Sequence, residues 1–129
     1  MSNDMNIWEV VEDLFPITRS LSGKGNVETL EYIGKKLVPN LMQKSIPSGT
    51  EVYDWTVPPE WNINDAYVKN ANGKKIIDFS ENNLHVASYS TPFKGVVTEE
   101  TLLEHLHVLD KHPSWIPYRT TYYSKTWGL

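Results

Sequence analysis

The pattern of apolar and polar positions near the start of the chain is that of a helix with one buried face. Apolar side chains recur at spacings of three and four, at Ile7, Val10, Val11, Leu14 and Phe15. This spacing predicts a first helix from Met5 to Phe15. Asn3 or Asp4 is placed to cap its first amides, and Pro16 ends it.

A second apolar run with the same spacing follows a stretch of small and polar residues. Its members are Leu30, Ile33, Leu37 and Leu41. The run predicts a second helix from about Val27 to Leu37, opened by Asn26. Pro39 disfavours continuation, because proline lacks a backbone donor and restricts the residue before it.

From Ile46 onward the period changes from helical to alternating. Residues Glu51 to Val57 alternate apolar with polar side chains, which predicts a half-buried strand with Trp55 in the core. Pro58 and Pro59 stop this strand. A further strand is predicted from Leu84 to Ser90 by its apolar content.

A hairpin is predicted between these two strands. Two extended segments, Asp65 to Lys69 and Lys74 to Phe79, flank the sequence Ala71-Asn72-Gly73. Asn-Gly supplies the positive dihedral angles that a tight hairpin turn needs. We therefore expect Asn72 and Gly73 at the tip, with the segment around Val68 paired to that around Ile76.

The last third of the chain predicts one helix and an aromatic terminal stretch. Thr98 is a good helix cap, and the two glutamates after it favour the positive end of the helix dipole. The apolar face that follows predicts a third helix from Thr98 to Leu109. The stretch from Trp115 to Leu129 is rich in tryptophan and tyrosine and needs a surface to pack on.

Composition and charge narrow the function classes. The chain has 129 residues, and 12 Lys+Arg against 16 Asp+Glu give a net charge of -4, which disfavours nucleic acid as a partner. Cysteine is absent, which excludes disulfides and thiolate metal sites and agrees with a cytoplasmic location. We expect no membrane partner, because no stretch approaches the roughly 20 apolar residues of a membrane span.

The histidines are the first candidates for metal chemistry, and their spacing argues against it. His105 and His107 lie two apart on a predicted helix, where they point to different faces. His107 and His112 suit the negative end of that helix instead. We therefore expect no metal ligand and no catalytic residue in this chain.

A glycine-containing loop and the acidic pairs are only weak indications of a functional site. Ser22-Gly23-Lys24-Gly25-Asn26 resembles a phosphate-binding loop, but it lacks the full spacing and the Lys-Ser/Thr pair that would hold a nucleotide and Mg²⁺. A flexible loop before a helix is the favoured interpretation. The acidic pairs are interpreted as solvated surface groups, because no apolar run flanks them to raise a pKa.

The aromatic residues leave several interpretations open. They form a core, a stacking platform for a sugar, or an anchor set for a protein partner. The candidate ligand or interface contacts are Trp61, His85, Trp115, Tyr118, Arg119, Tyr122 and Trp127.

Four stretches of the chain resemble one protein family. They are LFPITRSLSGKGNVETLEYI, IPSGTEVYDWTVPPEWNINDAYV, NNLHVASYSTPFKG and WIPYRTTYYSKTWGL. Together they resemble bacterial aminopeptidase-like proteins of unknown function, found beside polysaccharide-biosynthesis genes and related to the co-catalytic zinc aminopeptidases. The resemblance runs from about Asp13 to the last residue.

The resemblance implies only the N-terminal part of such a protein. In that part, an opening pair of helices belongs to the peptidase domain and a small β-rich module is inserted after it. Zinc is implied for the catalytic part, whose ligand stretch is a His-Pro-Ser run followed by Asn-Asp. His112-Pro113-Ser114 matches three letters of that run, but Trp115 follows. No ligand is therefore transferred to this chain.

These observations predict an α+β chain. It has two N-terminal helices, a small antiparallel sheet from about Ile46 to Ser90, one further helix and an aromatic C-terminal stretch. Residues 1–45 form a helical segment that resembles the start of a peptidase domain, and residues 46–129 form the β-rich module.

The predicted function is that of the non-catalytic N-terminal portion of a zinc aminopeptidase-like protein, inactive alone. Its partner is then a catalytic peptidase region, a separate catalytic chain or a second copy. The alternative is a carbohydrate- or peptide-binding module that acts without catalysis.

Overall fold

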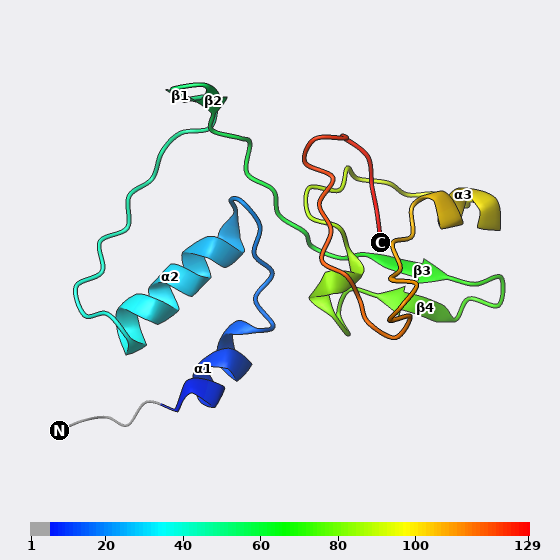
Figure 1. Ribbon diagram of the computed structural model, residues 1–129, viewed down its shortest axis with the longest axis horizontal. Coiled ribbons are helices and arrows are strands. Elements are labelled where there is room, and N and C mark those ends of the chain that lie inside the picture. Colours follow the sequence, from blue (N-terminus) through cyan, green and yellow to red (C-terminus); the bar gives the residue numbers. More distant parts are fainter. Residues whose placement is uncertain (1–5) are drawn as a thin grey trace. The chain divides into compact units, whose positions relative to one another are not determined.

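The structure, a computed structural model, describes residues 6–129 and has the mixed α+β composition that the sequence predicts. Its elements in chain order are α1 (Ile7–Leu14), α2 (Lys24–Lys36), β1 (Glu51–Val52), β2 (Trp55–Thr56), β3 (Tyr67–Lys69), β4 (Lys75–Asp78), the 3-10 helix η1 (Asn83–His85) and α3 (Glu99–Glu104). The chain divides into two units, Met1–Asn62 and Ile63–Leu129 (Figure 1).

The first helix is confirmed, with a different cap. The side chain of Asn6 accepts a hydrogen bond from the amide of Trp8 at 3.1 Å, so Asn6 is the cap. The predicted caps, Asn3 and Asp4, lie outside the described residues. The helix ends before Pro16 as expected, because Phe15 is its C-terminal cap.

The second helix begins three residues earlier than predicted. It starts at Lys24 after Gly23, so Asn26 lies inside the helix and is not its cap. The Asn26 side chain instead donates a hydrogen bond to the carbonyl of Ser20 at 3.0 Å. The first helical turn thus takes up the stretch that the sequence pattern assigned to a loop.

Polar side chains join α1 to α2. Lys36 Nζ lies 2.9 Å from Asp13 Oδ2 and 3.4 Å from Glu9 Oε1, and the Tyr32 hydroxyl donates to Asp13 Oδ2 at 2.8 Å. The hydrogen bond from Lys36 lowers the pKa of Asp13. Because these side chains are largely in water, they orient the helices more than they stabilise them.

The predicted strand from Glu51 to Val57 is wrong, because the chain folds back within it. Val52 pairs with Trp55, and Glu51 pairs with Thr56, which makes a short antiparallel hairpin. Tyr53 lies in the two-residue turn with a φ of +54°. Trp55 is consequently exposed and is not a core residue.

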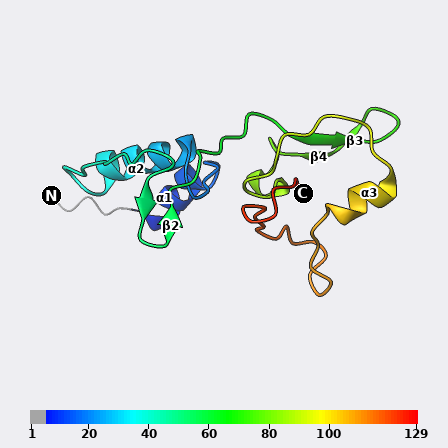
Figure 2. The ribbon, with the colours of Figure 1, turned by 90° about the horizontal axis from the view of Figure 1, so that it is seen from above.

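The hairpin at Asn72-Gly73 is confirmed, and the two strands lie side by side in Figures 1 and 2. Val68 pairs with Ile77, one residue beyond the expected partner. Gly73 has a φ of +77°, and its amide donates to the carbonyl of Asn70 at 2.9 Å. Asn72 has no positive φ, so the turn is the three-residue type in which only the last residue is left-handed.

The base of this hairpin is fixed by a buried carboxylate. Asp78 Oδ2 accepts from Lys75 Nζ at 2.6 Å, and its Oδ1 accepts from the amide and hydroxyl of Ser80. The Lys75 hydrogen bond, followed by those from Ser80, lowers the pKa of Asp78 to about 2. This contribution to stability is therefore present above about pH 4 and is lost as the pH falls toward 2.

Replacing Gly73 with valine should destabilise the hairpin by about 1 kcal/mol or more, because a β-branched residue resists a positive φ. Space is not the cause, since no atom lies within 4 Å of a side chain added at Gly73. Urea unfolding of Gly73→Val measures the effect, with Asn72→Ala as the control at a residue of ordinary φ. Equal stability of Gly73→Val and the unchanged chain would contradict this account.

The predicted strand from Leu84 to Ser90 is also wrong in its first half. The Asn82 side chain accepts from the amide of Leu84 at 2.9 Å and so starts the 3-10 helix Asn83–His85. Only the second half is extended, with Ser88 forming a parallel bridge to Thr120. Within residues 6–129 the strands therefore make two separate two-stranded sheets, not one sheet from Ile46 to Ser90.

The third helix starts where predicted and ends five residues early. The Thr98 hydroxyl accepts from the amide of Thr101 at 3.2 Å, which confirms the cap. The helix ends at Glu104, and His105 and His107 follow it instead of lying on it. The helix ends early because Leu129 bonds to the backbone of the residues that follow it. The amide of Leu129 donates to the carbonyl of His105, and the carbonyl of Leu129 accepts from the amide of His107.

Candidate functional site

The C-terminal unit is organised around a stack of three rings. Trp127 lies between His105, at 3.7 Å between ring centroids, and Phe93, at 5.1 Å, and both neighbours are nearly parallel to it. The ring nitrogen Nδ1 of His105 lies 2.8 Å from the carbonyl oxygen of Trp127. The stack thus ties the terminal segment to the residues after α3.

Gly128, the residue after Trp127, packs against a second histidine, His107. A side chain added at Gly128 would meet His107 Nε2 at 3.0 Å and the Cβ of Ala87 at 3.3 Å. Ala87 is buried, at 2% exposure. Burial, followed by the nearby charges of Arg119 and His105, lowers the pKa of His107.

Backbone hydrogen bonds of Ala87 and Ser88, which no sequence pattern marks, hold the C-terminal unit together. The amide of Ala87 donates to the carbonyl of Gly128, and the amide of Ser88 donates to that of Arg119. Thr121 returns a bond from its amide to Ser88 at 2.8 Å. These bonds run to residues more than 30 positions away, so no local pattern could have revealed them. In both views the last residues run back among the other segments of this unit (Figures 1 and 2).

The residues selected from the sequence in the C-terminal unit have separate sets of contacts. In the C-terminal unit, Trp115 is 62% exposed and stacks on His112, while Tyr118 is exposed and its hydroxyl lies 3.4 Å from Ser88 Oγ. Tyr122 meets Tyr89 edge to face. The remaining positions are half-buried Trp61 in the first unit, half-buried His85 in η1 and exposed Arg119.

The histidines do not assemble a metal centre within residues 6–129, where no group of three His, Asp or Glu side chains is suitably placed. His105 has its Nδ1 against a carbonyl and its ring face on Trp127. Since a catalytic zinc needs three protein ligands, the residues present do not fit one.

The loop that resembled a phosphate-binding motif has a packing role. A side chain at Gly25 would lie 1.8 Å from the carbonyl oxygen of Thr18, and one at Gly23 would lie 2.4 Å from that of Trp61. Asn62 Oδ1 accepts from the amide of Lys24 at 2.7 Å and so caps α2 from a distance. The two glycines allow these close approaches, and the amide of Lys24 already has a partner.

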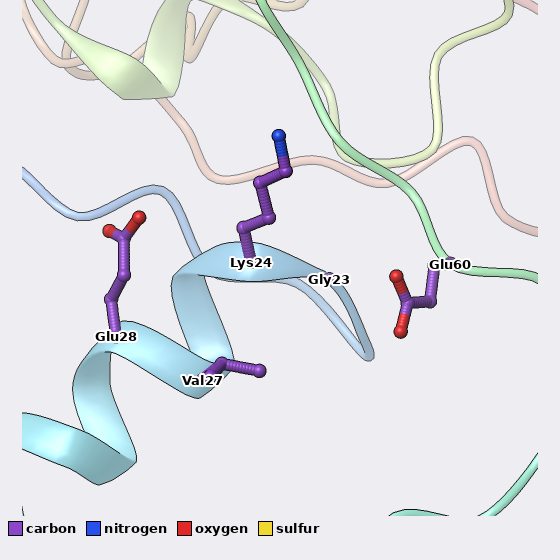
Figure 3. Close-up of a pocket in the computed structure, with 5 residues that line it drawn as sticks. All are labelled: Gly23, Lys24, Val27, Glu28 and Glu60. Atoms are coloured by element: carbon purple, nitrogen blue, oxygen red, sulfur yellow. The ribbon is translucent and has the colours of Figure 1, made fainter.

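A shallow open hollow of about 220 Å³ lies beside this helix start and is lined by Gly23, Lys24, Val27, Glu28 and Glu60. Val27 and the Glu60 carboxylate face one another across it, while Lys24 and Glu28 project away (Figure 3). Its charged groups do not converge on a common point, so it carries no site.

The helices of the first unit leave their apolar side chains in water. Among the described residues of α1 and α2, none is buried, and Ile7 and Trp8 are 70% and 73% exposed. We call the following residues the apolar helix surface: Ile7, Trp8, Val11, Phe15, Val27 and Leu30. Large exposed apolar sets on a folded chain mark interaction sites.

No helix within residues 6–129 combines the length and the apolar character that crossing a membrane requires.

Comparison with known proteins supports the resemblance seen in the sequence. A curated relative from Clostridium acetobutylicum, named "Putative polysaccharide biosynthesis protein with aminopeptidase-like domain", is 48% identical over 123 residues. The match covers 95% of this chain and 28% of the relative, so the chain spans little more than a quarter of the relative's length.

A solved structure and a family model agree with this relative. A crystal structure from Clostridium acetobutylicum, described as a "putative peptidase", is 48% identical, with a TM-score of 0.90 over 95% of this chain and 29% of that one. The family model "Domain of unknown function (DUF2172)" matches residues 60–129, which is more than half of the chain. The protein therefore belongs to the DUF2172 family.

Proposed function

We propose that this chain is the non-catalytic N-terminal portion of an aminopeptidase-like protein linked to polysaccharide biosynthesis. In this proposal the apolar helix surface packs against the aminopeptidase-like region, which supplies the catalysis. The relative's name and the chain's 28% share of its length support the assignment. We place the protein in the cytoplasm, because a chain without cysteine suits a reducing compartment.

The exposure of α1 and α2 is the observation that carries the proposal. Burying one large apolar side chain stabilises an assembly by roughly 1.5–3 kcal/mol relative to leaving it in water. Trp8 and Ile7 alone therefore represent a large unrealised stabilisation. A second surface that covers them would recover it, and the remaining part of the longer relative offers such a surface.

The side chains present support the non-catalytic assignment. A peptidase must activate water with a held metal or a placed base. The histidines described above do not fit zinc, so in this proposal zinc would be held by the aminopeptidase-like region.

Replacing Trp8 with serine should weaken capture of the aminopeptidase-like region of the Clostridium relative at least tenfold, while the chain stays folded. The reason is that Trp8 contributes apolar area and is 73% exposed in this chain. Titration calorimetry measures the affinity. Tyr53→Ser is the control, because Tyr53 is an even more exposed aromatic residue and lies on the β1–β2 turn, away from the helices. Equal loss in both variants, or none in Trp8→Ser, would contradict the proposed surface.

The purified chain should release no product from aminoacyl-nitroanilide substrates, with or without added zinc. A spectrophotometric assay of nitroaniline release measures this. Turnover that a chelator abolishes would show that the chain holds its own active site, and the non-catalytic assignment would then fail.

A further inference from the structure

Residues 42–46 form a connection with an unusual backbone. They run as an open stretch between α2 and β1 (Figure 1) and belong to no helix, strand or turn. Within the described part of the chain, none of their amides or carbonyls takes part in a hydrogen bond. Five consecutive residues therefore present free backbone donors and acceptors to water.

The apolar side chains of this stretch lie at its two ends, four residues apart. In a paired strand, successive side chains point to opposite faces, so pairing of this stretch would bring Met42, Lys44 and Ile46 to one face and Gln43 and Ser45 to the other. Met42 is 84% exposed and Ile46 is 60% exposed. Pro47 follows directly and ends any ladder, because it has no amide to donate.

Free backbone groups beside exposed apolar side chains make a template for strand addition. A strand that joins a sheet edge gains main-chain hydrogen bonds, and its alternate side chains find pockets. Water satisfies the backbone groups of residues 42–46 equally well, but it does not cover Met42 and Ile46. Pairing with a strand would satisfy both needs.

We propose that residues 42–46 add as a strand to the edge of a β-sheet in the aminopeptidase-like region. This inference rests on the proposed function, because the stretch follows directly after the helices assigned to the same partner. The matched segment covers only 28% of the relative, so most of its chain is available to supply the sheet that this proposal requires.

A second copy of the chain is a poorer occupant. In a symmetric antiparallel pair centred on residues 42–46, Lys44 would lie directly opposite its own copy. Like charges in directly opposed positions destabilise a sheet. Pairing with a different strand avoids this repulsion.

Hydrogen exchange resolved to single amides tests the inference. The chain is studied alone and joined to the aminopeptidase-like region of the Clostridium relative, in place of the relative's matching portion. In the joined protein, alternate amides among residues 42–46 should exchange at least tenfold more slowly than in the chain alone. Alternation is expected because an edge strand directs every second amide toward its neighbour.

Two proline variants distinguish strand pairing from simple burial. Gln43→Pro and Lys44→Pro remove amides that point to opposite sides of an extended chain. One variant should abolish the protection of the neighbouring amides, and the other should retain it. Equal effects of the two substitutions would overturn strand addition, as would exchange that is no slower in the joined protein.

The outcomes also separate this inference from the proposed function. If residues 42–46 stay unprotected while Trp8 becomes shielded from an acrylamide quencher in the joined protein, the strand inference fails and the proposed surface stands. If Trp8 also stays accessible, the proposed function fails. Protection that appears in the chain alone and rises with its concentration would identify a second copy and overturn the assigned occupant.

Discussion

Gly25→Ala should destabilise the helical unit by about 2–3 kcal/mol, whereas Gly34→Ala in the same helix should stabilise it by up to about 1 kcal/mol. At Gly25 the new carbon would lie 1.8 Å from the carbonyl oxygen of Thr18 and 2.8 Å from the carbonyl carbon, so the backbone must move. At Gly34 it would meet Leu41 at 3.5 Å, an ordinary contact, and alanine favours the helix.

Urea unfolding followed by helical circular dichroism measures both variants, since α1 and α2 contain most of the helix. The two substitutions make the same chemical change in one helix, so helix propensity cancels between them. A similar shift of the two midpoints in the same direction would show that the approach of Gly25 to Thr18 is not important for stability.

Trp127→Ala should destabilise the C-terminal unit by about 2–4 kcal/mol, because the substitution removes the middle ring of a three-ring stack. The substitution also removes the ring on which His105 and Phe93 each stack. Trp115→Ala is the matched control. Its ring stacks only on His112 and is mostly in water, so its loss should amount to about 1 kcal/mol or less.

Denaturant unfolding followed by near-ultraviolet circular dichroism measures these two variants. Trp127→Phe is a second comparison, because a smaller ring should keep part of the stacking and give an intermediate stability. If Trp127→Ala and Trp115→Ala are equally stable, the stack does not anchor the terminal segment and Trp127 is free to serve a partner.

Local signals predicted the elements whose stabilisation is local. The Thr98 cap, the end of the first helix at Pro16 and the hairpin at Gly73 were all predicted correctly, because each depends on residues within one turn. The strand from Glu51 to Val57 failed for a related reason. Alternating polarity predicts an extended strand but does not reveal a turn inside it. Tyr53 reverses the chain with a positive φ, which is a conformation uncommon for tyrosine.

The candidate residues were chosen by type, and their positions depend on distant contacts. Trp127 and Tyr122 were predicted interface residues, and the structure engages their rings within the C-terminal unit. Trp115 and Tyr118 keep exposed rings. Ser88 and Thr121 are small, polar and buried, and no sequence pattern marks them, because their importance comes from hydrogen bonds to each other.

The sequence by itself determined the α+β class, the two amphipathic helices, the glycine turn and the family. Each of these follows from residue spacing within a short window or from long matching stretches. Only the tertiary structure decided where α3 ends, where the chain divides and which apolar residues stay in water. Leu129 ends α3 by bonding to His105 and His107, and Asn62 caps α2 across 38 positions. Pairings between such distant residues depend on the path of the whole chain, which no local pattern of apolar and polar positions contains.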